Sequence, residues 1–168
     1  MKSIIASFAV LFFASITFAK APPVILEDGK EFYEIGLNLE ILEDLTGQLT
    51  IDDVNSPKWA VKFKRSKHMR SDLVASKSSF WARVKVNNKS IDQKLWVISQ
   101  NHYYQDHLTF FKKINGSWES IETGDRTDLK TREIKIKGFH FKIKPKQNVT
   151  YFFKVMGSFN AFDLTLSS

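Results

Sequence analysis

The chain has 168 residues, a formal net charge of +7 and no cysteine. This is the length of one domain that can bury a core without cross-links, and the lack of cysteine excludes a disulfide scaffold and a thiol nucleophile. The positive charge favours anionic partners, although an ordinary basic surface that keeps the protein soluble is the simpler interpretation.

The N-terminal segment has the pattern of a secretory signal. Lys2 precedes an apolar run over residues 4–18, and the small residue Ala19 closes it. We expect a signal peptide over residues 1–19, cleavage before Lys20, and a mature chain of 168 − 19 = 149 residues with a charge of +6 after loss of Lys2. An uncleaved anchor is the alternative. A secreted chain without cysteine fits the bacterial periplasm, and we expect no membrane-spanning helix after the signal.

The rest of the chain divides into a short tether and a β-rich domain. The two prolines after Ala21 predict an extended tether over residues 20–31, followed by a single domain over residues 32–168. Apolar and polar residues alternate in many short segments separated by turn formers, which predicts an all-β sandwich or barrel. The alternating segments are 34–44, 58–64, 80–86, 94–100, 107–113, 132–137, 139–144, 150–156 and 161–167.

Two local signals are more specific. Thr50 can cap a helix whose first turn holds Asp52 and Asp53, and Pro57 ends it, so we expect one short helix near residues 50–56. Asp53 occupies the acidic position of a capping box. Asn115-Gly116 predicts a tight hairpin between two strands, with Trp118 just past the turn.

The segment FWARVKV, residues 80–86, raises the first question about function. Alternation places Trp81 and Arg83 together on the face opposite Phe80 and Ala82, about 7 Å apart along the strand. An indole beside an arginine can bind a sugar ring and its polar groups. The alternative is that Trp81 points into the sandwich and Ala82 points outward, because tryptophan is mostly buried.

The loop over residues 100–107 is the second candidate site. It crowds Tyr103 and Tyr104 with His102 and His107, and loops on a rigid sandwich often carry binding residues. The tyrosines are either rim contacts for a ligand or half-buried packing residues. The histidines are spaced too poorly for a shared metal, and we expect no metal site or cofactor. Residues 122–128 have the composition of a calcium loop without its spacing, which favours a simple turn. Trp96 lies between two apolar residues and is expected in the core.

Catalytic signatures are missing from the sequence. There is no G-x-S-x-G elbow and no H-E-x-x-H motif, and nothing fixes two carboxylates at the separation that a glycosidase needs. We therefore expect no enzyme activity.

Several landmarks in order resemble a known family. They are YEIGLNLEILED, LTIDDV, FWARVKVNN, LWVISQNHYYQDHLTFF, ETGD and TYFFKV. Together they are similar to the type-two extracellular sensor domain of bacterial seven-transmembrane receptors with diverse intracellular signalling modules (7TMR-DISM), over roughly residues 32–166. The resemblance implies a jelly-roll-like sandwich, similar to carbohydrate-binding modules, that senses glycans or related ligands. The family positions match Trp81, Arg83, Trp96, Gly124 with Asp125, and Lys154.

The sequence as a whole predicts a non-catalytic periplasmic sensor-like module for signal transduction. We expect it to bind a carbohydrate or an anionic envelope molecule and no nucleic acid. The predicted ligand contacts are Trp81, Arg83, Tyr103, Tyr104 and Lys154. One alternative is a protein-interaction subunit that docks on a membrane signalling receptor or on its own copy, and another is an envelope glycan hydrolase. Since the chain ends after the last strand, we expect a stand-alone module or a detached sensor.

Overall fold

The computed structural model describes residues 20–168 except 74–77, 92–93 and 146. Its regular elements are, in chain order, β1 (Val24–Leu26), β2 (Phe32–Glu34), η1 (Gly36–Asn38), β3 (Leu39–Asp44), α1 (Ile51–Asn55), α2 (Pro57–Ala60), β4 (Lys64–Arg65), β5 (Ser71–Leu73), β6 (Ser79–Asn88), β7 (Trp96–Gln100), β8 (His107–Ile114), β9 (Ser117–Thr123), η2 (Leu129–Thr131), β10 (Phe139–Ile143), β11 (Val149–Met156), β12 (Asn160–Phe162) and β13 (Leu164–Ser167).

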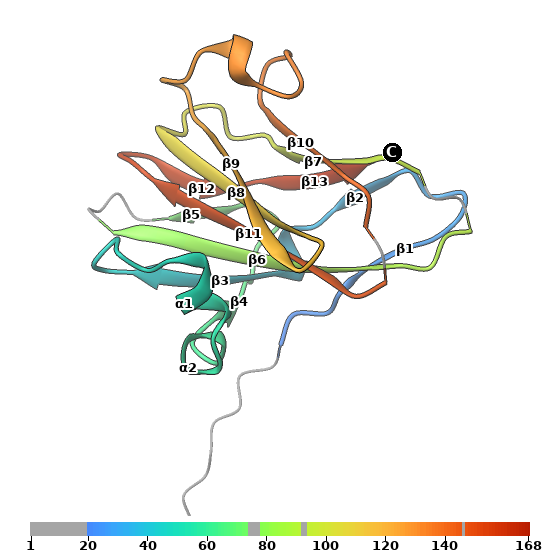
Figure 1. The fold of residues 1–168 in the computed structure, drawn as a ribbon, viewed down its shortest axis with the longest axis horizontal. Coiled ribbons are helices and arrows are strands. Elements are labelled where there is room, and N and C mark those ends of the chain that lie inside the picture. Colours follow the sequence, from blue (N-terminus) through green and yellow to red (C-terminus); the bar gives the residue numbers. More distant parts are fainter. Residues whose placement is uncertain (1–19, 74–77, 92–93, 146) are drawn as a thin grey trace, which may run out of the picture.

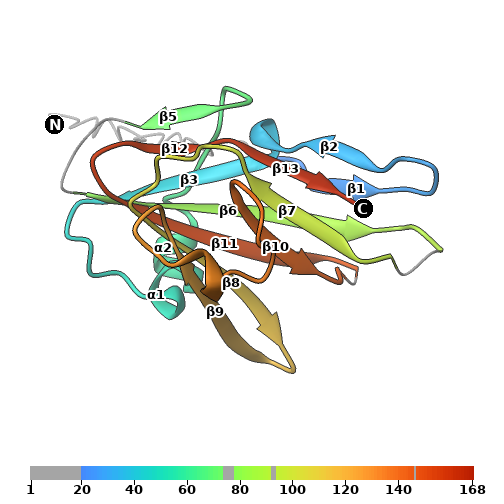
Figure 2. The same cartoon turned by 90° about the horizontal axis from the view of Figure 1, so that it is seen from above.

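The strands form two facing sheets, as Figures 1 and 2 show. The larger sheet has the order β4-β3-β6-β11-β8-β9, with β1 added parallel to β6. The smaller sheet has the order β10-β7-β13-β2, and β5 and β12 form a separate pair. One hydrophobic cluster joins residues of both sheets, so the expected all-β sandwich is confirmed.

Strand β6 shows why alternation predicted its faces correctly. Phe80, Ala82 and Val84 point into the core between the sheets, where Trp96 and Ile98 of the small sheet meet them. The predicted core position of Trp96 is therefore confirmed, since its side chain is 2% exposed. Trp81 belongs to a second, smaller cluster on the outer face of the large sheet. Both faces of β6 are thus covered.

A helical cover, which we define as residues 45–63, lies over that outer face, on the side of the large sheet away from the small sheet (Figure 1). Its first helix, α1, begins where the sequence predicted. Thr50 accepts a hydrogen bond from the Asp53 backbone N–H, and the Asp53 carboxylate accepts one from the Thr50 backbone N–H, which completes the capping box.

The strand expected over residues 58–64 is wrong. Pro57 at the first position of α2 preorganises a second helical turn, and only Lys64 and Arg65 join the sheet, as β4. Residues 132–137 also form no strand. There the Arg132 guanidinium donates to the carbonyl oxygens of Gly124 and Gly138, which holds the segment in a series of bends.

Two further local expectations concern the hairpin and the N-terminal tether. The Asn115-Gly116 hairpin is confirmed, because both residues have positive φ (50° and 88°) and Ile114 pairs directly with Ser117. The tether expected over residues 20–31 differs from the structure, because its residues 24–26 form β1 beside β6 and Leu26 is fully buried in the core.

Candidate ligand-binding site

The face predicted to bind a ligand gathers three of the five expected residues. Trp81 and Arg83 lie on the outer face of β6. Lys154, on the neighbouring strand β11, is directly opposite Trp81. The Lys154 ammonium lies 5.2 Å from the centre of the Trp81 ring. Trp81, Arg83 and Lys154 thus come together as predicted, whereas Tyr104, expected on the rim of the same site, lies in a different part of the molecule.

The expected accessibility of Trp81 is wrong. Its side chain is 1% exposed, stacked on Phe111 at 5.3 Å and covered by Val54 and Phe63 of the helical cover. The alternative, that the ring points into the main core, is also wrong, because a separate cluster of its own encloses it. A sugar therefore cannot stack on the Trp81 ring.

Arg83 is equally committed to internal contacts. Its Nε donates to Glu40 Oε2 at 2.7 Å, with the two side chains 9% and 5% exposed. One terminal amino group donates to the Ala60 carbonyl oxygen at 2.9 Å, and the guanidinium lies 4.2 Å from the Phe63 ring centre. Arg83 thus ties the end of α2 to the sheet.

Lys154 and Asp44 fasten the first loop of the helical cover. The Lys154 ammonium donates to the carbonyl oxygens of Gly47 and Leu49, at 3.0 and 3.2 Å. The Asp44 carboxylate accepts from the backbone N–H groups of the same two residues. Lys154, a predicted ligand contact, therefore has a structural role: together with Asp44 it holds the cover over Trp81.

An open pocket lies elsewhere, at the end of the sandwich where three loops meet. We call it the loop-end pocket. It is formed by the loop between β7 and β8, the turn after β9 and the turn after β11, and its volume is about 470 Å³. Its lining residues are His102, Tyr104, Asp106, Asp125, Arg126, Ser158 and Phe159.

Two aromatic rings of this pocket are open to solvent. Tyr104 is 73% exposed and Phe159 is 69% exposed. The ring of His102 packs edge-on against Tyr104, with ring centres 6.4 Å apart. Exposed apolar rings beside polar groups are what a site for a sugar or another small ring needs.

The polar side of the loop-end pocket centres on Asp106. Its carboxylate accepts a hydrogen bond from the Ser158 backbone N–H at 2.9 Å and lies 3.6 Å from the Arg126 guanidinium. The hydrogen bond from the Ser158 backbone N–H, together with the nearby Arg126 guanidinium, lowers the pKa of Asp106 and outweighs the partial desolvation that opposes it. Asp106 is therefore ionised at neutral pH, while Arg126, 74% exposed, keeps most of its donors for a ligand.

Two glycines allow the loops to close around Asp106. A side chain at Gly157 would collide with the Asp106 carboxylate, and one at Gly124 would collide with its backbone carbonyl. The backbone N–H of Asp125 donates to the Gln105 carbonyl oxygen, which joins the turn after β9 to the loop before β8. Residues 122–128 thus include a turn held by the main chain. Among the described residues, no group of three or more acidic or histidine side chains could hold a metal ion.

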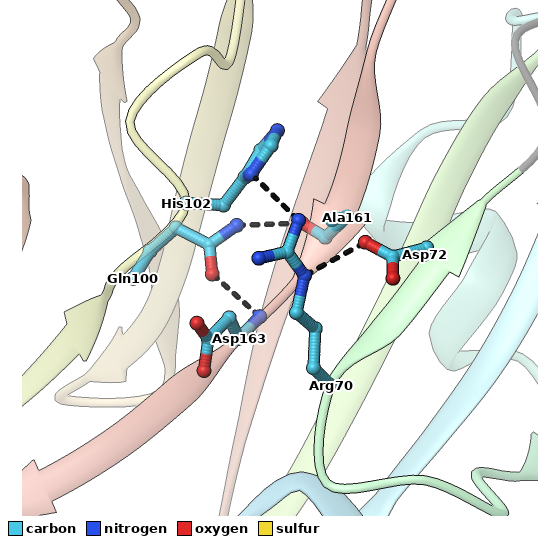
Figure 3. A network of polar contacts seen from close by, with 6 residues as sticks. All are labelled: Arg70, Asp72, Gln100, His102, Ala161 and Asp163. Carbon is cyan, nitrogen blue, oxygen red and sulfur yellow. Dashed lines mark hydrogen bonds and ion pairs between the residues drawn. The ribbon is translucent and has the colours of Figure 1, made fainter.

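Figure 3 shows a polar network that includes His102, one of the lining residues of the pocket. Gln100 is fully buried, donates to the Ala161 carbonyl oxygen at 2.6 Å and accepts from the Asp163 backbone N–H at 2.8 Å. These bonds fix the end of β7, from which the loop departs. Arg70, paired with Asp72, then contacts His102 Nδ1 at 3.4 Å. His102 Nε2 is buried and has no partner among the described residues.

Tyr103 and Tyr104 separate in the structure. Tyr104 lines the loop-end pocket, whereas Tyr103 is not one of its lining residues and lies under the Lys137 ammonium, 4.6 Å from its ring centre. Tyr104 is 73% exposed and Tyr103 is 44% exposed, so half-buried packing describes Tyr103 and not Tyr104.

Sequence reasoning missed Arg126, Ser158 and Phe159 as parts of the site. The signal for Phe159 was present, because a phenylalanine directly after Gly157-Ser158 sits in a turn where burial is difficult. Arg126 lies inside residues 122–128, where the acidic residues suggested a calcium loop and the arginine carried no separate signal.

Comparison with known proteins supports the sequence resemblance. The family model described as 7TMR-DISM extracellular 2 matches residues 36–168, while comparison with curated proteins gives no match. Within the described part of the chain, no helix is long and apolar enough to span a membrane. The match covers most of the chain, and with the β-sandwich it identifies the protein as a member of the 7TMR-DISM extracellular 2 family, a sensor-type domain outside the cytoplasm.

Proposed function

We propose that this protein is a periplasmic sensor module that binds a carbohydrate or a related envelope ligand in the loop-end pocket, without converting it. It is exported by a cleaved signal over residues 1–19, which lie outside the described residues, and it passes its bound state to a membrane signalling receptor. The family match supports the sensor role, and the residues that line the loop-end pocket support the class of ligand.

The exposure of Tyr104 and Phe159 beside Arg126 is the observation that carries the proposal. Burying either ring against a ligand removes apolar surface from water, and the pocket volume of about 470 Å³ suits a small ligand such as a sugar or short glycan. The Arg126 guanidinium can donate to hydroxyl groups or pair with a carboxylate of an acidic sugar. Trp81, Arg83 and Lys154 support the sheet beneath the cover and are not proposed to touch the ligand.

The charge state of Asp106 does not suit the general acid of a glycosidase. Glycoside hydrolysis needs a carboxylic acid whose pKa is raised so that it can protonate the leaving group. The pKa of Asp106 is lowered, chiefly by the Ser158 backbone N–H, so this side chain serves as a hydrogen-bond acceptor.

A binding screen with matched variants tests the proposal. The protein is expressed from the full 168-residue chain and recovered after export, and its mass shows whether residues 1–19 have been removed. Calorimetry against neutral and acidic glycan fragments of the envelope then identifies a ligand. We expect Tyr104→Ala to weaken binding about tenfold or more, since a stacked ring contributes roughly 1–3 kcal/mol.

Tyr103→Ala is the matched control, because it removes the same side chain from the neighbouring position outside the pocket. It should leave the affinity within about twofold, since a surface substitution away from the ligand changes little. Equal losses in the two variants would place the ligand elsewhere, and a panel without any saturable binding would refute the carbohydrate class.

A further inference from the structure

A second groove, which we call the lysine groove, lies at the opposite end of the sandwich. It has a volume of about 330 Å³. It lies between the C-terminal end of β8, the start of β7 and the C-terminal end of β10. Four lysines line it, from two different sheets: Lys112 and Lys113 of β8, and Lys142 and Lys144 in and just after β10. In Figure 2 the β8–β9 hairpin projects from the body of the sandwich beside it.

The charge of the lysine groove is poorly balanced. Glu133 is the acidic residue among its lining side chains, and it accepts a hydrogen bond from the Lys142 backbone N–H. Four lysines and one glutamate give a local charge of 4 − 1 = +3. Within the described part of the chain, none of the four lysines forms an ion pair, although Glu119 stands across from Lys112 in β9. Such a cluster raises the local concentration of anions.

Apolar side chains share this groove with the lysines. Ile114 is 40% exposed and Leu95 is 46% exposed, and the floor is formed by Tyr151 and Ile143, both buried. Burial also raises the pKa of Tyr151, so its hydroxyl group stays neutral. A free inorganic anion gains nothing from exposed Ile and Leu side chains, whereas the glycerol and upper acyl carbons of a lipid do.

The lysines are also arranged for several anions instead of one. Lys112 and Lys113 project from β8, and Lys142 and Lys144 from β10 and the residues just after it, all on long flexible side chains. The Lys113 ammonium also lies 5.3 Å from the centre of the Trp118 ring. A surface that carries many phosphates satisfies such a spread of charges better than one small ion does.

We propose that the lysine groove docks on the phosphate headgroups of an anionic lipid bilayer, with Ile114 and Leu95 against the lipid glycerol and upper acyl region. Strand β8 begins at His107, directly after Asp106 of the loop-end pocket, and ends at Ile114 in the groove, so the two sites are on the order of 20 Å apart. Docking in this way holds the sensor on the membrane and turns the loop-end pocket away from it.

Vesicle co-sedimentation of the exported protein tests this. The probes are vesicles of phosphatidylcholine alone and vesicles of phosphatidylcholine and phosphatidylglycerol in equal parts. We expect binding to the anionic vesicles alone, and a loss of about 25-fold for the Lys112→Gln/Lys142→Gln variant, at about fivefold for each lysine near the surface. Lys64→Gln/Lys67→Gln is the control, because it removes the same charge from exposed positions on another part of the molecule.

Three results would overturn the proposal: equal losses in the two double variants, binding to neutral vesicles as strong as to anionic ones, or complete displacement by glycerol 3-phosphate at millimolar concentration. The last result would show a site for a free phosphorylated molecule. The melting temperature of each variant shows that it is folded, and glycan binding in the loop-end pocket remains measurable whatever the vesicles do.

Discussion

Two places in this protein combine an aromatic ring, an arginine and a carboxylate, and they differ in almost every physical respect. Under the helical cover, Arg83 and Glu40 lie 2.7 Å apart with side chains 9% and 5% exposed, next to a sealed Trp81. In the loop-end pocket, Arg126 and Asp106 lie 3.6 Å apart with side chains 74% and 18% exposed, near an open Tyr104.

The difference teaches that residue types alone do not identify a binding site. In the closed region Arg83, Glu40 and Lys154 bind groups of the protein itself, so the ion pair and the ring hold two layers together. In the open region the arginine and the rings retain unused surface, which a ligand can cover. Substitutions in the closed region should therefore affect stability, and those in the open region should affect binding.

The largest effect is expected from breaking the closed ion pair. Arg83→Ala leaves the Glu40 carboxylate buried without its partner, which typically costs about 3–5 kcal/mol of unfolding free energy. Chemical denaturation measures this. The matched change in the open region, Arg126→Ala, should leave the denaturation midpoint unchanged, and an equal loss in both variants would remove the contrast between the two regions.

Truncation of Trp81 should cause the next largest loss of unfolding free energy. Truncation to alanine opens a large cavity under the cover and should cost about 3–5 kcal/mol. Trp81→Phe should retain most of the stability, because the indole N–H is buried without a partner among the described residues and its removal costs little. A melting temperature that is unaltered in Trp81→Ala would mean that the ring is not enclosed as described.

Lys154 gives a smaller and more local effect. Lys154→Met removes two charge-assisted hydrogen bonds to the cover and should cost roughly 1.5–3 kcal/mol. Hydrogen exchange should accelerate first in residues 45–60, with β7 and β13 unchanged. Uniform acceleration across the chain would instead show that the cover does not open as a separate unit.

Acid should loosen the same cover through Asp44. Burial opposes ionisation of Asp44, but hydrogen bonds from the Thr46 side chain and from the backbone of Leu49, Thr46 and Gly47 outweigh it and lower its pKa. A carboxyl group whose pKa is lower in the folded state stabilises the fold above its unfolded pKa of about 3.9, and this contribution is lost as the pH falls through the folded value.

We therefore expect a loss of stability below about pH 4, monitored by urea denaturation. Asp44→Asn should be less stable at neutral pH and should show a shallower decline in acid. An identical acid dependence in this variant would assign the effect to other carboxylates.

The smallest effect on stability is expected at Tyr104. Its ring is 73% exposed, so Tyr104→Ala should change the free energy of unfolding by no more than about 0.5 kcal/mol while it weakens ligand binding. Thermal melts and calorimetry on one sample separate the two quantities. A large destabilisation would mean that the ring supports the loop and not a ligand.

Alternation along strands predicted the fold well because it reports faces directly. The opposite sides of β6, the Asn115-Gly116 hairpin and the capped helix at Thr50 all follow from local rules. What covers the outer face of β6 did not follow, because that depends on residues 45–63 folding back over it. Their alternating part was interpreted as a strand, although Pro57 instead begins a helical turn.

The candidate site was predictable only in part for a similar reason. The crowded loop over residues 100–107 was visible in the sequence, and so was the turn over residues 122–128. Their meeting with Phe159 comes from the order of β7, β8 and β11 in the two sheets, which no single segment encodes.

The most direct test of the central claim, that the ligand enters the loop-end pocket and not the face of Trp81, is a ligand titration followed by NMR. Residues 102–106, 124–126 and 157–159 should show the largest shifts, with the Trp81 indole N–H signal unmoved. A ligand that shifts the Trp81 indole and residues 45–60 while the three loops stay unchanged would contradict it.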